Sequence, residues 1–138
     1  MPSVLGVLET CIYVQDLDLT EKFYDQVLGL RVVGKDAGRD VFFRVAPGSL
    51  LLAFRAEATR KGGVLPPHGA EGETHLALTI PPEELVAWKE HLARHGVEVE
   101  LEYQWPRGIS LYFRDPDRNL VELVSADIWP ASSAADIR

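Results

Sequence analysis

The sequence predicts an α+β protein in which two tandem βαβββ modules form a curved, cup-like mixed sheet. Two observations lead to this fold class. The segment from Glu9 to Val14 is matched by the segment from His75 to Ile80, at an offset of 66 positions. FFRVAPGSLLLAF, starting at Phe42, is matched by YFRDPDRNLVELV, starting at Tyr112, at an offset of 70. A repeat of this length indicates two copies of one supersecondary unit, and insertions in loops account for the drift in offset.

The first module is expected at residues 4–55. Asp18, three residues before Glu21, predicts a capping-box-like helix start, and Gly29 predicts the end of that helix. The helix carries one apolar stripe with members four residues apart: Leu19, Phe23 and Val27. The other expected elements are a strand at about 4–14 and short strands near 30–34, 40–46 and 49–55.

The second module, expected at residues 73–125, repeats this order. Pro82 suits the first turn of its helix, and His95-Gly96 predicts the helix end. The apolar stripe of this helix consists of Leu85, Trp88 and Leu92. The expected strands are 73–80, 97–104, 108–113 and 120–125, with a tight turn at 115–119. Between the modules, residues 56–72 are rich in Gly and Pro, and their length predicts a functional lid or a flexible linker.

At 138 residues, the chain is expected to form a single domain with a sizeable core. Its 14 basic and 21 acidic side chains give a net charge of −7 without a basic cluster, which argues against nucleic acid as a partner. The single cysteine, Cys11, excludes an internal disulfide and fits a reducing compartment. The sequence shows neither a signal-peptide pattern nor an apolar run of about 20 residues that could span a bilayer. We therefore expect a cytoplasmic protein without a membrane partner, with a frayed end at 130–138.

Side chains at successive strand positions point to opposite faces, so the first strand of each module has an aliphatic face and a face that carries chemistry. Glu9 lies on the second face in the first module, and His75 holds the matching position in the second. Glu122 is a carboxylate within the apolar run LVELV, where an unbalanced buried charge is costly. Its counterpart at the offset of 70 is Leu52. The three ionisable residues at matched positions are potential metal ligands, although Glu122 could instead pair with one of four arginines: Arg44, Arg55, Arg107 and Arg114.

Three stretches, ETCIYVQDLDLTEKFYDQVLGL, GETHLAL and GISLYFRDPDRNLVEL, resemble the vicinal oxygen chelate superfamily. This superfamily includes glyoxalase I, fosfomycin-resistance proteins, methylmalonyl-CoA epimerase, extradiol ring-cleaving dioxygenases and metal-free bleomycin-resistance proteins. The resemblance covers residues from about 5 to 125 and implies the paired βαβββ fold, often as a homodimer whose sites take ligands from one or both chains. Because the motifs are common to all these chemistries, they favour the fold over any single reaction.

The resemblance implies Glu9, His75 and Glu122 as metal ligands, with Glu9 and Glu122 also as catalytic groups. The family's first ligand is usually His, and the usual Gly of its DPDGN turn is Arg118 here. One His and two carboxylates form a hard, anionic set suited to divalent Mn, Fe, Zn, Ni or Mg. His68 is either a lid or proton-carrying residue or an exposed loop histidine. The residues expected to contact a small-molecule substrate are Tyr13, Phe54, Tyr103, Trp105, Arg107 and Tyr112.

We expect a metal-dependent enzyme, with a lyase or isomerase favoured, in which the ion chelates adjacent oxygens of the substrate and one carboxylate acts as a base. Two anionic ligands weaken the case for an extradiol-type dioxygenase, and Leu52, at the position of an extra glyoxalase carboxylate, weakens the case for a glyoxalase. The alternative class is a metal-free, ligand-sequestering protein of the bleomycin-resistance type, and the charge of −7 suits a cationic drug. Thiol transfer to an epoxide antibiotic would need a potassium-site loop and an anion clamp, neither of which we identify in the sequence. Arg107 is the best candidate to contact an anionic substrate group, since its guanidinium suits a carboxylate or phosphonate.

Overall fold

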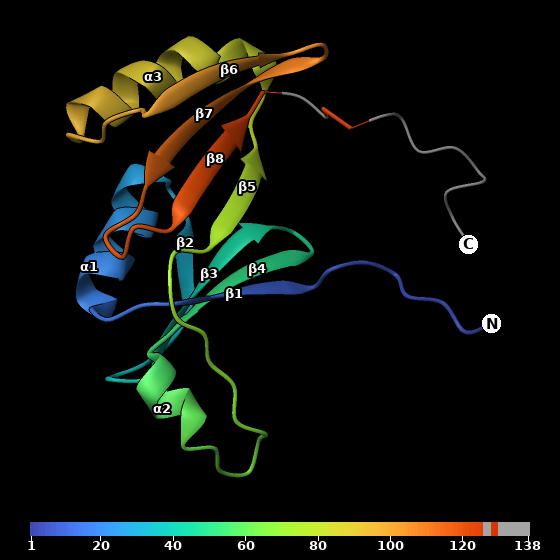
Figure 1. Ribbon diagram of the computed structural model, residues 1–138, viewed down its shortest axis with the longest axis vertical. Coiled ribbons are helices and arrows are strands. Elements are labelled where there is room, and N and C mark those ends of the chain that lie inside the picture. The colour runs from blue at the N-terminus through green and yellow to red at the C-terminus, as the bar shows by residue number, and fades with distance from the viewer. Residues whose placement is uncertain (126–127, 130–138) are drawn as a thin grey trace. The chain divides into compact units, whose positions relative to one another are not determined.

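The computed structural model describes residues 1–125 and 128–129. Within them, the strands form two four-stranded mixed sheets, in the orders β1-β4-β3-β2 and β5-β8-β7-β6 (Figure 1). The predicted fold class, α+β with two tandem βαβββ modules, is confirmed. The elements of the first module are β1 (Glu9–Tyr13), α1 (Leu17–Lys22), η1 (Phe23–Val27), β2 (Arg31–Asp36), β3 (Asp40–Ala46) and β4 (Ser49–Phe54), followed by α2 (Ala56–Arg60). Those of the second are β5 (His75–Thr79), η2 (Pro82–Glu84), α3 (Leu85–Arg94), β6 (Leu101–Trp105), β7 (Gly108–Arg114) and β8 (Leu120–Val124).

The chain divides into two compact units. The first consists of Met1–Thr74 together with the turn Asp115–Arg118, and the second of His75–Arg114 together with the residues from Asn119 onward. Among the described residues, no helix has both the length and the apolar character needed to cross a membrane.

Strand pairing is the same in the two modules. In each, the first strand pairs in parallel with the last, so that Glu9 is opposite Leu50 and His75 is opposite Leu120. Two positions further along, Cys11 is opposite Leu52 and Ala77 is opposite Glu122. The sequence offsets of 66 and 70 are therefore the true structural equivalences, and Leu52 occupies the place that Glu122 holds in the second module.

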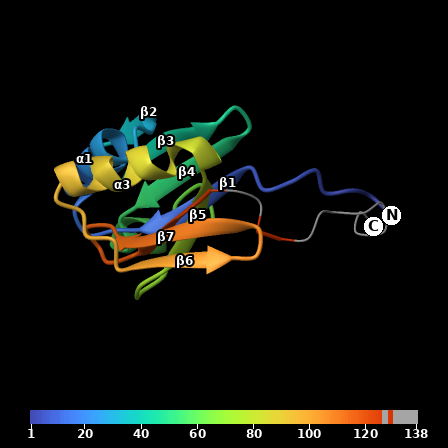
Figure 2. The same ribbon diagram turned by 90° about the horizontal axis from the view of Figure 1, so that it is seen from above.

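Each sheet buries one face, and the alternation of side chains decides which residues lie there. Helix α1 packs against β3 and β4 of the first sheet, and α3 covers one face of the second (Figure 2). Leu92 of α3 is completely buried. The sheet residues of the core are Ile12, Val41, Phe43, Leu51 and Ala53 in the first module and Leu111, Phe113, Val121 and Leu123 in the second. The opposite face of each sheet is therefore left for the ionisable and aromatic side chains.

The first helix begins earlier than the sequence indicated. Its N-cap is Asp16, whose carboxylate accepts hydrogen bonds from the backbone N–H groups of Asp18 and Leu19, both at 3.0 Å. Asp18 therefore lies in the first turn instead of capping the helix. The helix continues as the π-helical turn η1 and ends at Gly29 with φ +68°, as predicted, because this left-handed conformation favours glycine.

Other boundaries also differ from the prediction. Strand β1 begins at Glu9, because pairing with β4 starts there, and the apolar residues before it are exposed. Strand β6 begins at Leu101, four residues later than expected. The segment 56–72 contains the short helix α2, which was not predicted. The helix end at Gly96, with φ +69°, is confirmed. The frayed end expected at 130–138 lies outside the described residues.

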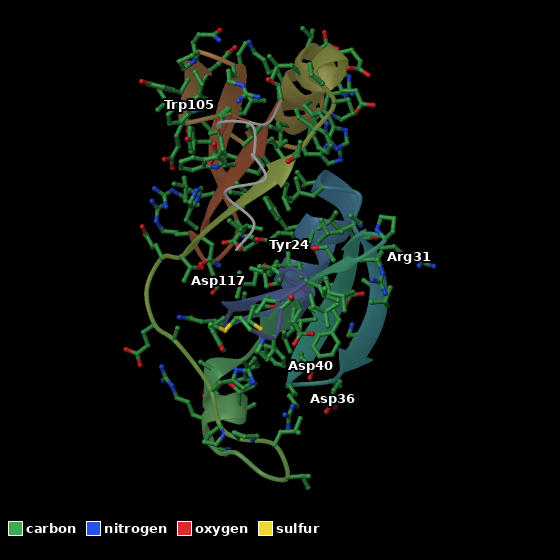
Figure 3. The ribbon with its side chains drawn as sticks, turned by 90° about the vertical axis from the view of Figure 1, so that its right-hand side faces the viewer. Tyr24, Arg31, Asp36, Asp40, Trp105 and Asp117 are labelled. Carbon is green, nitrogen blue, oxygen red and sulfur yellow. The ribbon has the colours of Figure 1, made fainter. Side chains whose placement is uncertain are left out.

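Tyr24 connects η1 to the turn between β7 and β8 within the first unit. The side chain is completely buried, and its hydroxyl donates a hydrogen bond to Oδ2 of the buried Asp115 at 2.8 Å (Figure 3 labels Tyr24). Burial, with the Asp115 carboxylate as the next cause, raises the pKa of Tyr24 well above its ordinary value. The phenol is therefore held in its neutral, donating form.

Replacing Tyr24 with Phe is expected to lower the free energy of unfolding by about 1.5 to 3 kcal/mol, the usual contribution of a hydrogen bond to a charged group. Urea denaturation at neutral pH measures this difference. Tyr103→Phe is the matched control, since Tyr103 is exposed, and it is expected to change stability by less than about 0.5 kcal/mol. Equal losses in the two variants would contradict a structural role for the Tyr24 hydroxyl.

Arg118 adopts φ +66°, a left-handed conformation that costs a residue with a Cβ atom more than it costs glycine. We expect Arg118→Gly to be more stable than Arg118→Ala by about 1 kcal/mol. Both variants lose the exposed ion pair of Arg118 with Glu73, which is 2.9 Å long, so the comparison isolates the backbone effect. Thermal or urea unfolding measures the stability of the two variants. A glycine variant less stable than the alanine variant would contradict the prediction.

Candidate metal centre and substrate pocket

Glu122 and His75 meet on the open face of the second sheet. Glu122 is only 5% exposed, and its Oε2 lies 3.1 Å from Nε2 of His75. The other ring nitrogen of His75, Nδ1, lies 3.0 Å from the carbonyl oxygen of Leu120. A carbonyl can only accept, so Nδ1 carries a proton and donates it. This second bond fixes the orientation of the ring and directs Nε2 toward the carboxylate.

The second oxygen of Glu122 is held by its own hydrogen bonds. The indole N–H of Trp105 donates to Oγ of Ser110 at 2.8 Å, and the Ser110 hydroxyl donates to Oε1 of Glu122 at 2.5 Å. Because an indole N–H can only donate, the direction of this chain is fixed. The pKa of Tyr112 is raised mainly by burial and next by a hydrogen bond with Glu122. Ser110 therefore holds Oε1 of Glu122 in place as a hydrogen-bond acceptor.

A pocket of about 490 Å³ opens over this pair. It contains two of the predicted substrate contacts, and it is lined by His75, Ala77, Thr79, Trp105, Tyr112, Glu122, Val124, Ile128 and Trp129. Of the other two predicted contacts in this module, Tyr103 is exposed with its ring 4.7 Å from that of Trp105. Arg107 lies between β6 and β7, where its Nη1 donates to the carbonyl of Trp129 at 2.6 Å.

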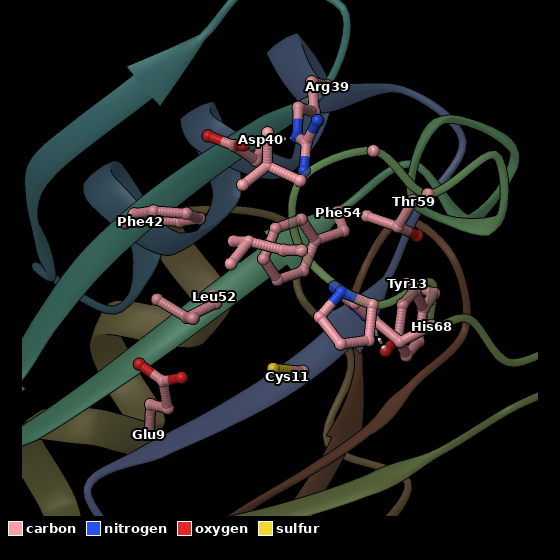
Figure 4. Close-up of a pocket in the computed structure, with 15 residues that line it drawn as sticks. Glu9, Cys11, Tyr13, Arg39, Asp40, Phe42, Leu52, Phe54, Thr59 and His68 are labelled. Carbon is pink, nitrogen blue, oxygen red and sulfur yellow. Dashed lines mark hydrogen bonds and ion pairs between the residues drawn. The ribbon is translucent and has the colours of Figure 1, made fainter.

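The first module has a pocket of its own, of about 850 Å³, on the equivalent face of its sheet (Figure 4). Glu9 and Cys11 of β1 lie along one side, and Leu52 stands opposite them on β4. The two predicted contacts from this module, Tyr13 and Phe54, also line it. The remaining wall comes from β3 and from residues of the segment 56–72.

His68 lies in this pocket. Its Nδ1 is 2.6 Å from Oη of Tyr13, and its ring meets Phe54 edge-on with the ring centres 4.8 Å apart. His68 is an exposed loop residue, as one sequence alternative had it, and it also lines the pocket, where a lid residue would lie. A histidine in a Gly- and Pro-rich segment carries no sequence signal that predicts this position.

The three predicted metal ligands are thus placed in two groups. His75 and Glu122 are brought together in the second module, and Glu9 lies in the first. Within the described ranges, no cluster of three or more His, Cys, Asp or Glu side chains is suited to hold a metal. The ion pair of Glu122 is with His75, whereas three of the arginines considered as its partners contact other groups: Arg55 pairs with Glu57, Arg107 with Trp129 and Arg114 with Glu100.

Ser110 is a contact that the sequence analysis missed. It holds Glu122, and the signal was present, since Ser110 and Tyr112 alternate along β7 on the same face as Glu122 of β8. Ser110 could have been identified as a hydroxyl residue within an apolar strand, on the face that carries the carboxylate of the neighbouring strand.

Comparisons with known proteins agree with the fold. The crystal structure of lactoylglutathione lyase from Agrobacterium tumefaciens superposes with a TM-score of 0.86, at 32% sequence identity, covering 93% of this chain and 98% of that one. Metallothiol transferase FosB from Bacillus licheniformis is 28% identical over 130 residues, which span 92% of this chain and 79% of that protein.

A third similarity concerns the fold alone. The fosfomycin resistance protein FosX from Listeria monocytogenes has a TM-score of 0.70 at 22% identity, covering 90% of this chain and 93% of that one. A mutant of that protein was crystallised with Mn(II) and 1S,2S-dihydroxypropylphosphonic acid. The family model that matches this sequence covers residues 6–123. The chain therefore belongs to the Glyoxalase/Bleomycin resistance protein/Dioxygenase superfamily.

Proposed function

We propose that this protein is a metal-dependent lyase or isomerase that acts on a small molecule with adjacent oxygen atoms. The proposal rests on the pair formed by His75 and Glu122. Nε2 of His75 and Oε2 of Glu122 face each other, while Nδ1 of His75 and Oε1 of Glu122 are hydrogen-bonded to other groups. The 32% identity with a lactoylglutathione lyase supports the reaction class. The prediction of a cytoplasmic protein stays a prediction.

The donor set fits a divalent ion. Two ligands at about 2.1 Å from one ion stand roughly 3.0 to 3.4 Å apart at octahedral to tetrahedral angles, and Nε2 of His75 and Oε2 of Glu122 are 3.1 Å apart. The bond from Nδ1 of His75 to a backbone carbonyl is the outer support that metal-binding histidines use. Glu9 is proposed as the third ligand, and the oxygen-rich set suits Mn, Fe, Zn, Ni or Mg.

Each residue has a defined task in this proposal. A divalent ion held there would supply Lewis acidity for the substrate's adjacent oxygens. Ser110 and Trp105 hold the Glu122 carboxyl group in one orientation. Glu9 is exposed in the pocket of the first module and is the carboxylate better placed to accept a proton from a substrate carbon, because one oxygen of Glu122 is already occupied by Ser110.

A second candidate function is ligand binding without a metal. It is favoured by the same pair, since a protonated His75 would balance the buried charge of Glu122 without any ion. The protein would then sequester its ligand, as bleomycin-resistance proteins do. Ring cleavage by an extradiol-type dioxygenase is the remaining alternative, and it would require ferrous iron and oxygen.

Metal analysis of protein purified without chelator is expected to find about one divalent ion per chain, as a preformed site with outer-sphere support would bind. His75→Ala and Glu122→Ala are each expected to weaken metal affinity by at least about tenfold, because each removes a direct ligand. His95→Ala is the matched control, since His95 ends α3 and lies in neither pocket.

Three outcomes separate the functions. Metal in the wild-type protein with turnover of a lactoylglutathione-type hemithioacetal in the absence of oxygen supports the lyase. Turnover only with ferrous iron and oxygen uptake supports the dioxygenase and rejects the lyase. Failure to bind any of the five metals after reconstitution rejects both and favours sequestration.

We expect the working form to be a homodimer, as is usual in this family. We propose that the partner's Glu9 completes each site, as in those members that take ligands from both chains. Glu9→Ala and His75→Ala chains should each bind metal poorly alone. A mixed dimer of the two, isolated with two affinity tags, should regain one intact site. Light scattering that shows a monomer, or a mixed dimer without metal, would contradict this arrangement.

A further inference from the structure

We propose that the pocket of the first module binds an uncharged aromatic group of the substrate, with His68 as its hydrogen-bonding contact. The inference rests on the proposed function, because it names the substrate class for that site. It can be tested without the metal, because Glu9 is the one pocket residue among the proposed ligands, and the contacts on which the inference rests are those of other residues, such as Phe54, Leu65 and His68.

The pocket is walled by rings. Phe54 stands at the centre, with Phe42 edge-on at 5.5 Å, Tyr13 stacked at 6.4 Å and His68 edge-on at 4.8 Å between ring centres (Figure 4). Aromatic rings prefer such stacked and edge-on contacts with further rings. Leu52, which replaces the carboxylate of the second module, adds an aliphatic floor. A volume of about 850 Å³ is in the range of pockets that bury an organic ligand.

The charges of the pocket do not favour a small anion. Its cation, Arg39, lies with Nε 3.5 Å from Oδ2 of Asp40. Glu9 adds a second carboxylate, so the charged side chains that line the pocket sum to −1 with His68 neutral. A phosphonate would need a surplus of positive donors. A neutral ring system has no such requirement.

The segment 56–72, called the cover below, forms part of the wall of this pocket. The backbone N–H of His68 donates to the carbonyl of Thr59 at 3.3 Å, which ties the segment back to α2. Arg60 pairs with Glu71 at 3.0 Å, and a Cβ atom at Gly69 would lie 2.8 Å from Nε of Arg60. The segment is therefore held by its own contacts, and residues 62–66 of it line the pocket.

The apolar side chains at the tip of this segment are exposed to solvent. Leu65 is 70% exposed and Val64 is fully exposed, yet both line the pocket. Apolar side chains held at a pocket mouth gain free energy when a ligand removes them from water. An aromatic ligand would supply that burial.

The polar contact is His68. Its Nδ1 is engaged by the Tyr13 hydroxyl in either ring tautomer, so Nε2 remains for a ligand. It can donate to or accept from one polar group on an otherwise apolar molecule. The part of the substrate that this pocket would hold is therefore an aromatic body with a single uncharged hydrogen-bonding group, and the adjacent oxygens belong to the rest of the molecule.

Binding of 1-naphthol and naphthalene to metal-stripped protein, followed by fluorescence, tests the inference. The wild-type protein should bind both saturably, and methylphosphonate in large excess should not displace either. Leu65→Asp should weaken both probes by about tenfold, since it places a charge at the apolar mouth. Val86→Asp is the matched control on α3, where Val86 is also exposed, and should bind within about twofold of wild type.

His68→Phe keeps the ring and removes its nitrogens. It should weaken 1-naphthol by about fivefold, the equivalent of one hydrogen bond, and leave naphthalene within about twofold. His75→Ala should bind both probes like the wild type, so a failure of the metal proposal does not disturb this test. Absence of saturable naphthalene binding, displacement by methylphosphonate, or equal effects of Leu65→Asp and Val86→Asp would overturn the aromatic pocket. An unchanged preference for 1-naphthol in His68→Phe would overturn the role of His68.

Discussion

Burying the carboxylate of Glu122 between Val121 and Leu123 is the constraint on which the second module's open face depends. Removing an ionised carboxylate from water costs several kcal/mol unless each oxygen finds a partner. One oxygen receives the Ser110 hydroxyl, whose direction is fixed by Trp105, and the other faces His75. The positions of three side chains on three different strands are thus set by the need to compensate one charge.

Strand register explains why this compensation appears in only one module. The same parallel pairing places Leu52 in the first sheet where Glu122 stands in the second, and Cys11 where Ala77 stands. With an aliphatic residue at that point, the first module has no buried charge to balance there, and aromatic rings fill the face instead. The same strand pairing therefore supports a His–Glu pair in the second module and an apolar pocket in the first.

The sequence was sufficient for the fold class, because a repeated pattern of alternation and helical stripes determines which elements form. It was less accurate at the ends of elements. Asp16 instead of Asp18 caps α1, since the cap is decided by which carboxylate reaches two free N–H groups, and β1 begins only where β4 pairs with it. The convergence of His75 and Glu122 could be predicted from their matched positions. The bond between Tyr13 and His68 could not, because it joins residues 55 apart through an irregular segment.

The division of the chain into two compact units has a consequence for how such a protein can diversify. The residues proposed to select the ligand belong to one unit, and the His–Glu pair belongs to the other. Substitutions or insertions in the cover around Leu65 would alter selectivity while leaving the pair on β5 and β8 intact. Under the proposed function, a gene of this kind can therefore acquire new ligands by local mutation while the His–Glu pair stays unchanged.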